Sequence, residues 1–169
     1  MPSVIAIISR ATNQGTSYLL IKRRKEPYIG KWALVGGKWD FGESLAAAVI
    51  RETKEETGLT AFFLGLRGVV NYRLMPHGEA DRGAHFSLFL CAVHAPEGKP
   101  CEQAEGTVAC FGRTELGELN AATQIVPTDY LILDLYERPA RSISYFEAEV
   151  VAAREGADLI DVVRFEALP

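Results

Sequence analysis

Cysteine is scarce in this sequence, and no two cysteines form a CxxC pair. The chain of 169 residues has three, Cys91, Cys101 and Cys110. A small, odd set of cysteines does not make the disulfide framework of a secreted domain. We therefore expect a reduced, cytoplasmic protein whose cysteines are ordinary packing or surface residues.

An excess of positive charge and long hydrophobic runs are also missing. The net charge is −4 at pH 7, whereas proteins that track polymeric nucleic acid usually carry a basic face. The apolar start of the chain, residues 4–8, is soon interrupted by Arg10, so it is neither a signal peptide nor a membrane span. We expect no polymeric nucleic acid and no membrane as partner. A mononucleotide stays possible, because bound metal ions can neutralise its phosphates.

Composition and length predict one globular domain. Hydrophobic residues make up 48% of the chain, which is enough to form a core, and a chain of this length is short for two domains.

Hydrophobic periodicity and turn residues predict a mixed α/β fold around one sheet. The expected strands are residues 4–8, 18–23, 32–35, 59–74, 84–93 and 107–111, and the expected helices are residues 45–57 and 129–136. The end of the chain, residues 143–151 and 158–165, fits either a hairpin or a helix plus a strand. It would complete the sheet or form a dimer contact.

The helix expected over residues 45–57 carries an unusual set of charges. Ser44 can cap its start and Gly58 its end. Glu52, Glu55 and Glu56 are three and four residues apart, so they project to one side and repel one another. Either Arg51, four residues before Glu55, or a hard divalent cation could compensate this charge. By itself, such a pattern is more often a solvated acidic surface.

Glycines flank this helix on the N-terminal side. Gly36 and Gly37 are expected to end a strand, and Gly42 lies just before the helix. Glycines allow close approach of the backbone to a ligand, although plain turn formation explains them equally well.

Together, these residues resemble the signature G-x5-E-x7-R-E-U-x-E-E-x-G-U of the Nudix hydrolase superfamily, in which U is aliphatic. This signature is called the Nudix box, and here it covers residues 37–59. The positions that match are Gly37, Glu43, Arg51, Glu52, Glu55, Glu56, Gly58 and Leu59. Thr53 departs from the aliphatic position, and Val35 stands where many relatives have proline. Neither departure removes a ligand. The position of Thr53 packs the helix on the sheet, and the position of Val35 affects only the geometry of the turn.

The resemblance implies a Nudix-like α/β/α sandwich (α+β) with a mixed sheet, in a single domain over residues 1–169. The likeness extends to about residue 136, and residues 137–169 form a C-terminal extension. Many members of the superfamily are homodimers.

The activity implied by the resemblance is Mg²⁺-dependent (or Mn²⁺-dependent) cleavage of a pyrophosphate bond in a nucleoside diphosphate linked to another group. The implied metal ligands are the side chains of Glu52, Glu55 and Glu56 and the carbonyl of Gly36. Gly37, Glu43, Arg51 and Gly58 would support this segment. The general base would be Glu52 or Glu56, or a carboxylate of a later loop, where we favour Glu102 narrowly over Glu105.

Basic residues near the expected site suggest contacts to phosphate. Arg23, Arg24 and Lys38 are the candidates, since guanidinium groups match phosphate geometry and lysine supplies a point charge. A solvated basic strand end is an equally good interpretation of the first two.

The substrate stays open between two classes. The loop at residues 37–44 and the His85–Phe86 pair resemble those of nucleoside triphosphate pyrophosphatases, including those that remove oxidised nucleotides. ADP-ribose and nucleotide-sugar pyrophosphatases have a similar Nudix box. They often carry a proline shortly after it, and Pro76 is close to that position but does not match it. The side chains that could stack on a base are Tyr28, Trp32, Trp39, Phe41 and His85. A nucleotide-binding sensor domain without activity is disfavoured, because such domains usually lose a box glutamate.

Overall fold

One sheet of eight strands organises the described part of the chain, which in this computed structural model comprises residues 1–26, 28–76, 82–95, 100, 103, 106–137, 143–152 and 160–168. The strands are β1 Pro2–Thr12, β2 Gly15–Arg23, β3 Trp32–Lys38, β4 Phe62–Met75, β5 Ala84–His94, β6 Gly106–Gly112, β7 Ser144–Ala152 and β8 Ile160–Leu168. Their order across the sheet is β6-β2-β3-β1-β5-β4-β7-β8. The sheet is mixed, because β1–β5 and β4–β7 are parallel pairs whereas the other neighbours are antiparallel.

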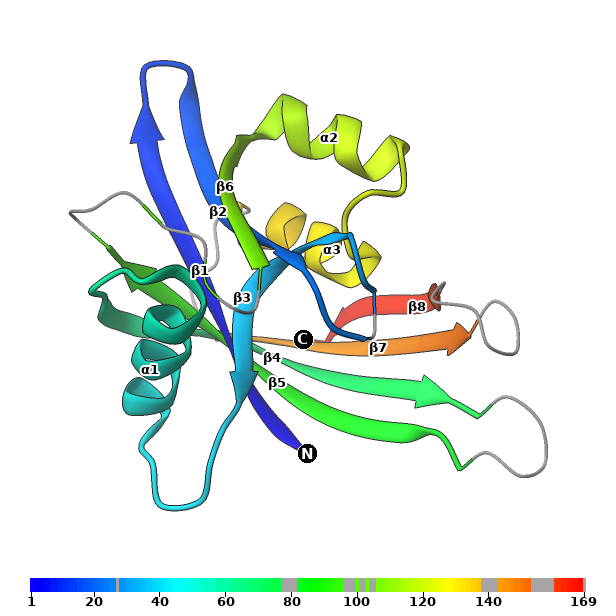
Figure 1. Cartoon of the computed structure of the whole chain (residues 1–169). Coiled ribbons are helices and arrows are strands. Elements are labelled where there is room, and N and C mark those ends of the chain that lie inside the picture. Colours follow the sequence, from blue (N-terminus) through cyan, green and yellow to red (C-terminus); the bar gives the residue numbers. More distant parts are fainter. Residues whose placement is uncertain are drawn as a thin grey trace.

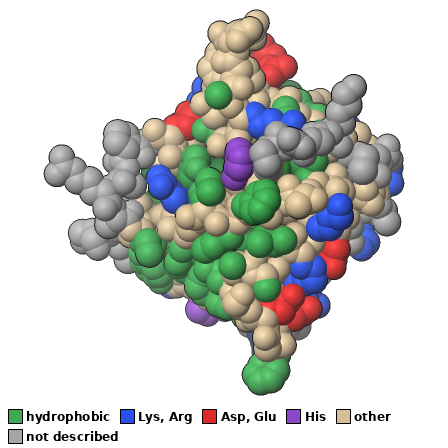
Figure 2. All heavy atoms as spheres, turned by 90° about the vertical axis from the view of Figure 1, so that its left-hand side faces the viewer, with side chains coloured by type: hydrophobic (Ala, Val, Ile, Leu, Met, Phe, Trp, Pro, Cys, Tyr) green, Lys and Arg blue, Asp and Glu red, His purple; other side chains and the backbone are tan. Residues whose placement is uncertain are grey.

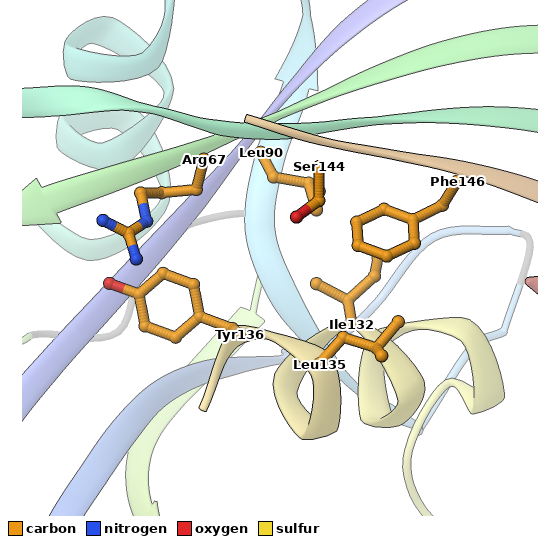
Figure 3. Close-up of a pocket in the computed structure, with 7 residues that line it drawn as sticks. All are labelled: Arg67, Leu90, Ile132, Leu135, Tyr136, Ser144 and Phe146. Atoms are coloured by element: carbon orange, nitrogen blue, oxygen red, sulfur yellow. The ribbon is translucent and has the colours of Figure 1, made fainter. Parts of the chain in front are cut away.

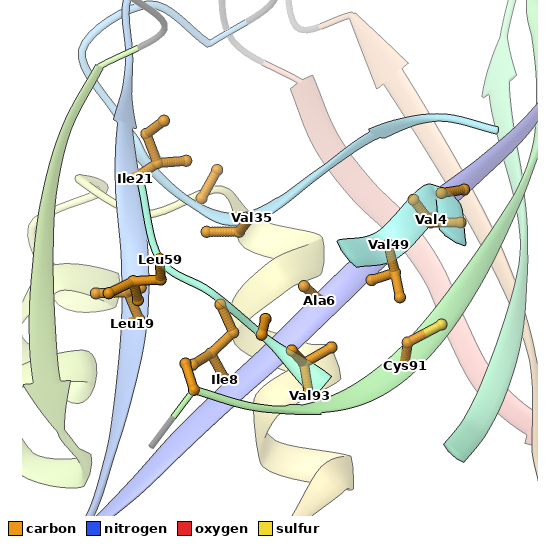
Figure 4. Packing of buried hydrophobic residues seen from close by; sticks show 14 of the residues in the cluster. Val4, Ala6, Ile8, Leu19, Ile21, Val35, Val49, Leu59, Cys91 and Val93 are labelled. Atoms are coloured by element: carbon orange, nitrogen blue, oxygen red, sulfur yellow. The ribbon is translucent and has the colours of Figure 1, made fainter. Parts of the chain in front are cut away.

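Helices cover both faces of this sheet (Figure 1). They are α1 Leu45–Thr57, α2 Arg113–Ala121 and α3 Pro127–Tyr136. Successive side chains of a strand point to opposite faces. Ala6 and Ile8 of β1 accordingly share a buried cluster with Val49 of α1 (Figure 4), whereas Ile7 shares another with Ile132 of α3. The α/β/α sandwich predicted from the sequence is confirmed.

The two ends of α1 are capped as its sequence predicts. The Ser44 hydroxyl accepts a hydrogen bond from the backbone N–H of Ala47 at 3.2 Å. At the other end Gly58 has a left-handed conformation with φ 72°, and its N–H donates to the Lys54 carbonyl. These caps fix where the acidic turns of the helix lie relative to β3.

Thr53 is fully buried between α1 and the sheet, as expected from its position in the box. Its hydroxyl donates to the carbonyl of Val49 at 2.7 Å. The hydroxyl is therefore satisfied within the helix, and threonine replaces an aliphatic residue here without leaving a buried donor unpaired.

Two elements differ from the sequence prediction. The strand expected to end at Val35 continues through Gly36 and Gly37, which pair with Ile5 and Val4 of β1. Helix α2 was not predicted, because Gly117 weakens its helical pattern and Leu116 is its only buried residue among those described.

The C-terminal segment forms the hairpin that was one of the two alternatives, and the helix-plus-strand alternative is wrong. Strands β7 and β8 are antiparallel, and β7 pairs in parallel with β4 from Gly68↔Ser144 to Met75↔Val151. The hairpin therefore completes the sheet.

The space between α3 and the strands leaves one small cavity of about 20 Å³ (Figure 3). The Arg67 guanidinium lies 5.4 Å from the centre of the Tyr136 ring at this cavity. Its volume suits roughly one water molecule, so it is too small to be a nucleotide site.

The side of the molecule that carries α1 shows a broad area of hydrophobic side chains (Figure 2). Large hydrophobic side chains that are more than half exposed include Phe41, Phe62 and Leu64. Apolar areas of this kind can mark contact surfaces. Among the described residues, no helix is long and apolar enough to cross a membrane.

A buried carboxylate joins α3 to β3. Asp129, in the first turn of α3, accepts a hydrogen bond from the backbone N–H of Leu34 at 2.7 Å. Burial raises the pKa of Asp129 to about 6, against the opposing effects of the Leu34 N–H and the charge of Arg23. The side chain thus holds its proton to a higher pH in the folded than in the unfolded protein.

Replacement of Asp129 tests how much its raised pKa makes the stability of the protein depend on pH. Because the folded-state pKa of Asp129 is the higher one, its contribution to stability is complete below about pH 4 and is lost as the pH rises to about 6. Asp129→Asn removes this dependence. We expect the unfolding free energy of the variant, relative to the parent, to rise by on the order of 2 to 3 kcal/mol between pH 4 and pH 7. Urea titrations at several pH values measure it, and a difference independent of pH would contradict the assignment.

A matched pair of glycine substitutions tests the close contact of β3 with β1. A Cβ atom on Gly36 would lie 2.2 Å from the Val4 carbonyl oxygen, whereas one on Gly117 would meet nothing within 4 Å. Gly36→Ala should lower the unfolding free energy by about 1 to 3 kcal/mol. Gly117→Ala should raise it by about 0.5 to 1 kcal/mol, since alanine favours the helix. Equal effects of the two changes in urea unfolding would refute the steric argument.

Candidate active site

The acidic face of α1 lies against the last residues of β3. The Glu56 side chain is buried, and its Oε2 accepts a hydrogen bond from the backbone N–H of Gly36 at 2.9 Å. A Cβ atom on Gly37 would lie 2.5 Å from Oε2 of Glu52. Both carboxylates therefore approach the strand at a place that only glycines leave open.

Arg51 holds the acidic groups of this region together. Its Nε and Nη2 donate to the two carboxylate oxygens of Glu43, each at 2.8 Å, in a bidentate pair. Its Nη1 donates to Glu52 at 2.8 Å and to Glu55 at 3.3 Å, and its Nη2 also reaches the Lys38 carbonyl at 3.0 Å. The hydrogen bonds from Arg51 hold the pKa of Glu43 below its usual value. The pairing of Arg51 with Glu55 that the sequence suggested is present.

The loop between β3 and α1 is fixed by further contacts. The Trp39 indole donates to the Glu43 carbonyl at 3.0 Å, and the Asp40 N–H donates to the Glu43 carboxylate at 3.3 Å. The Trp39 ring also packs edge-on against Phe89 of β5 at 5.0 Å. These contacts connect the loop to the start of α1 and to β5.

The donor set on this face suits a hard divalent cation. Glu52, Glu55 and Glu56 and the backbone of Gly36 offer only oxygen atoms as ligands, as Mg²⁺ and Mn²⁺ prefer. The Glu55 side chain is 56% exposed and can reorient. Within the described ranges, no three His, Cys, Asp or Glu side chains already converge as a cage. The metal ligands named from the sequence stay a prediction.

A pocket of about 270 Å³ opens beside the same two glycines. Its wall contains Gly36 and Gly37 and aromatic side chains from three separate segments: Tyr28, Tyr72 and Phe86. The hydroxyls of Tyr28 and Tyr72 are 3.4 Å apart, and the rings of Tyr72 and Phe86 meet edge-to-face at 6.0 Å. This is a concave, largely apolar site with a few polar groups, as small-molecule pockets usually are.

Polar groups of the pocket include those of Arg23, Asp129, Tyr28 and Tyr72. Burial, followed by the neighbouring Tyr72 hydroxyl, raises the pKa of Tyr28, so its phenol stays neutral. Tyr28 also has a positive φ of 70°, a conformation that is costly for a bulky residue and that persists where surrounding contacts fix it. The pocket therefore combines a cation, a buried carboxylate and neutral hydroxyls.

Of the five side chains proposed to stack on a base, only Tyr28 lines this pocket. Trp32 packs on Phe111, Trp39 packs on Phe89, His85 contacts Asn71, and Phe41 is fully exposed. Sequence analysis missed Tyr72, Phe86 and Asp129 as pocket residues. The His85–Phe86 pair was noted, but the alternation of β5 directs Phe86 rather than His85 to this face.

The three residues predicted to contact phosphate lie at different places in the structure. Arg23 lines the pocket and Arg24 lies outside it, while Lys38 follows Gly37 at the end of β3. Their roles stay predictions. Glu102 and Glu105, the later carboxylates considered as general base, fall outside the described residues.

Known proteins resemble this chain in sequence and in fold. The NUDIX domain profile matches residues 1–136. An ADP-ribose pyrophosphatase of Methanocaldococcus jannaschii is 51% identical over 51 residues, which is 30% of this chain and 30% of the relative. The match thus spans less than a third of that relative's length.

Solved structures show the same fold. The MutT protein from Bacillus halodurans superposes with a TM-score of 0.71 at 20% identity, over 98% of this chain and 96% of the other. The NUDIX domain of Shewanella oneidensis NrtR, in complex with ADP ribose, gives a TM-score of 0.58 at 21% identity over 80% and 84% of the two chains. With the domain match over most of its length and the Arg51-centred acidic helix in place beside two glycines, the chain belongs to the NUDIX domain family.

Proposed function

We propose that the chain is a hydrolase that cleaves the pyrophosphate bond of a nucleoside diphosphate linked to another group. One observation carries this proposal: the Glu52 and Glu56 carboxylates lie at Gly37 and Gly36, and the same two glycines line the pocket. A ligand in the pocket would therefore extend towards the carboxylates.

The pocket suits the nucleoside part of such a substrate. Tyr28, Tyr72 and Phe86 offer faces and edges against which a base can pack. Asp129 offers carboxyl oxygens to the N–H groups of a base edge, and Arg23 supplies a charged donor. The diphosphate would then lie over Gly36 and Gly37, where the backbone can approach it closely.

The site also suits a divalent metal ion, which Nudix hydrolases generally use. We propose Mg²⁺ or Mn²⁺, held by Glu52, Glu55 and Glu56 with the Gly36 carbonyl. The chemistry that such an ion supplies is neutralisation of phosphate charge and acidification of water. Arg51 orients Glu52 and Glu55 through the contacts at 2.8 and 3.3 Å.

The proton acceptor would be one of three carboxylates. Glu56 is held by the Gly36 N–H and Glu52 by Arg51, so each has a fixed orientation near the glycines. Glu102 is the third candidate. A homodimer and a cytoplasmic location stay predictions.

Product analysis distinguishes the substrate classes. The protein is incubated with Mg²⁺ and a panel of ADP-ribose, nucleotide sugars, dinucleotides, and normal and oxidised deoxynucleoside triphosphates. AMP plus ribose phosphate from ADP-ribose would identify an ADP-ribose pyrophosphatase, which is the name of the relative from Methanocaldococcus jannaschii. A monophosphate plus pyrophosphate would identify a triphosphate pyrophosphatase. Binding without cleavage would instead favour a sensor domain and contradict the proposal.

Substitution of the box glutamates tests their assignment. Glu52→Gln and Glu56→Gln keep the side-chain shape but remove the negative charge, so each should lower kcat by about 100-fold or more. Calorimetric titration with Mn²⁺ should show weaker binding by both variants. Glu118→Gln, an exposed glutamate of α2, is the control and should change neither quantity. Unchanged metal affinity and turnover in Glu52→Gln and Glu56→Gln would contradict the assignment of these glutamates as metal ligands.

A further inference from the structure

Two carboxylates are anchored on the same edge of β3. The N–H of Leu34 donates to Oδ2 of Asp129 at 2.7 Å, and the N–H of Gly36 donates to Oε2 of Glu56 at 2.9 Å. Alternate residues of a strand present their N–H and C=O groups to the same edge. Because Leu34 and Gly36 are two residues apart, the two anchored oxygens lie about 7 Å apart along the strand.

The two carboxylates belong to different parts of the site. Glu56 is one of the proposed metal ligands, so the scissile diphosphate would lie at its end of the edge. Asp129 and Leu34 line the pocket. The group of a nucleotide that is bonded directly to the diphosphate is the ribose. The short spacing along β3 therefore brings Asp129 next to the ribose rather than to the more distant edge of the base.

Two of the aromatic side chains of the pocket come from strands further away. Phe86 belongs to β5 and Tyr72 to β4, and β1 lies between β3 and these two strands. Neighbouring strands are about 4.8 Å apart, so the backbones of Phe86 and Tyr72 lie about 10 and 14 Å from β3. The sequence of groups is thus Glu56, then Asp129, then the aromatic rings. It matches the sequence of diphosphate, ribose and base in a nucleotide.

Asp129 can accept further hydrogen bonds from a ligand. A carboxylate offers about four acceptor positions, of which the Leu34 N–H and the Thr128 side chain account for two. The Leu34 carbonyl turns to the same edge as the Leu34 N–H, so it lies next to this carboxylate. Asp129 is only 9% exposed and Leu34 is buried. Two neighbouring acceptors in a wall that water hardly reaches suit a pair of hydroxyl donors.

We propose that Asp129 and the Leu34 carbonyl accept hydrogen bonds from the 2′ and 3′ hydroxyls of a ribose, so that the pocket selects ribonucleotides over deoxyribonucleotides. Carboxylates bind ribose hydroxyls in the same way in dinucleotide-binding folds. A deoxyribonucleotide would leave a buried acceptor without its donor, and sites built for a hydroxyl strongly reject such analogues. The inference rests on the proposed function for the orientation of the ligand, and it moves the contact of Asp129 from the base edge to the ribose.

Binding of nucleotide pairs tests the proposal without requiring hydrolysis. Calorimetry in the presence of Mg²⁺ compares AMP, GMP, CMP and UMP, each with its 2′-deoxy form. At least one ribonucleotide should bind about tenfold more tightly than its deoxy form, the effect of one hydrogen bond to a charged group. Equal affinities within every pair, tighter binding of the deoxy forms, or no binding of any ribonucleotide would overturn the proposal.

A substitution of the carboxylate locates the effect. Asp129→Asn keeps one oxygen for the Leu34 N–H but replaces the other acceptor with a donor, so the ratio of ribo to deoxy affinity should fall close to one for every base. Asp134→Asn is the matched control, because Asp134 lies in the same helix, pairs with Arg113 and does not line the pocket. It should leave the ratio unchanged.

The same variant separates recognition of the ribose from recognition of the base. If Asp129→Asn changed the ranking of the four bases and left the ratio of ribo to deoxy affinity unchanged, Asp129 would contact the base and the proposal would be refuted. The comparison in the parent protein needs no substitution, so it decides the proposal even if this variant fails to fold.

Hydrolysis is then measured separately with ADP-ribose and with the same compound lacking the 2′ hydroxyl of its adenosine. If neither is cleaved but the ratio of binding affinities persists, the proposed function fails for these compounds and the ribose contact stands. If both are cleaved with the same kcat/KM and the ratio of binding affinities is one, the proposed function stands and the ribose contact fails.

Discussion

The guanidinium of Arg51 is the group on which the acidic surface of α1 depends. Glu43, Glu52 and Glu55 would repel one another at this spacing, and Arg51 contacts all three while also reaching the Lys38 carbonyl. A single planar cation thereby connects two turns of a helix with the loop that precedes it. The orientation of the carboxylates, and with it the approach of Glu52 to Gly37, follows from this arrangement.

The wall of the pocket contains a group that is costly to bury. Asp129 is buried at the start of α3, where burial disfavours its charge. The Leu34 N–H and the nearby charge of Arg23 offset only part of this effect. A hydrophobic residue would fill such a place at lower cost. The structure instead retains a group that can donate or accept a hydrogen bond in the wall of the pocket.

Sequence analysis predicted the local features well because they depend on spacing along one helix. The caps at Ser44 and Gly58, the common face of the glutamates and the buried position of Thr53 all follow from helical geometry. The pocket could not be predicted in this way. Tyr28, Tyr72 and Asp129 come from a loop, a strand and a helix, and only the register of the sheet and the docking of α3 bring them together. Likewise α2 has too few buried positions to give a helical pattern.

The parallel pairing of β7 with β4 has a consequence for how the chain folds. Asn71 and Glu147, which meet across this pair, are 76 residues apart in the sequence. Contacts over such a separation form late, because a long loop must close first. Until β7 arrives, the second half of β4 presents an open sheet edge that other chains can extend. Once in place, the hairpin replaces that edge with β8, which bears the exposed charges of Arg164 and Glu166. The C-terminal hairpin thus protects the sheet against aggregation, but only once residues 144–168 have been synthesised.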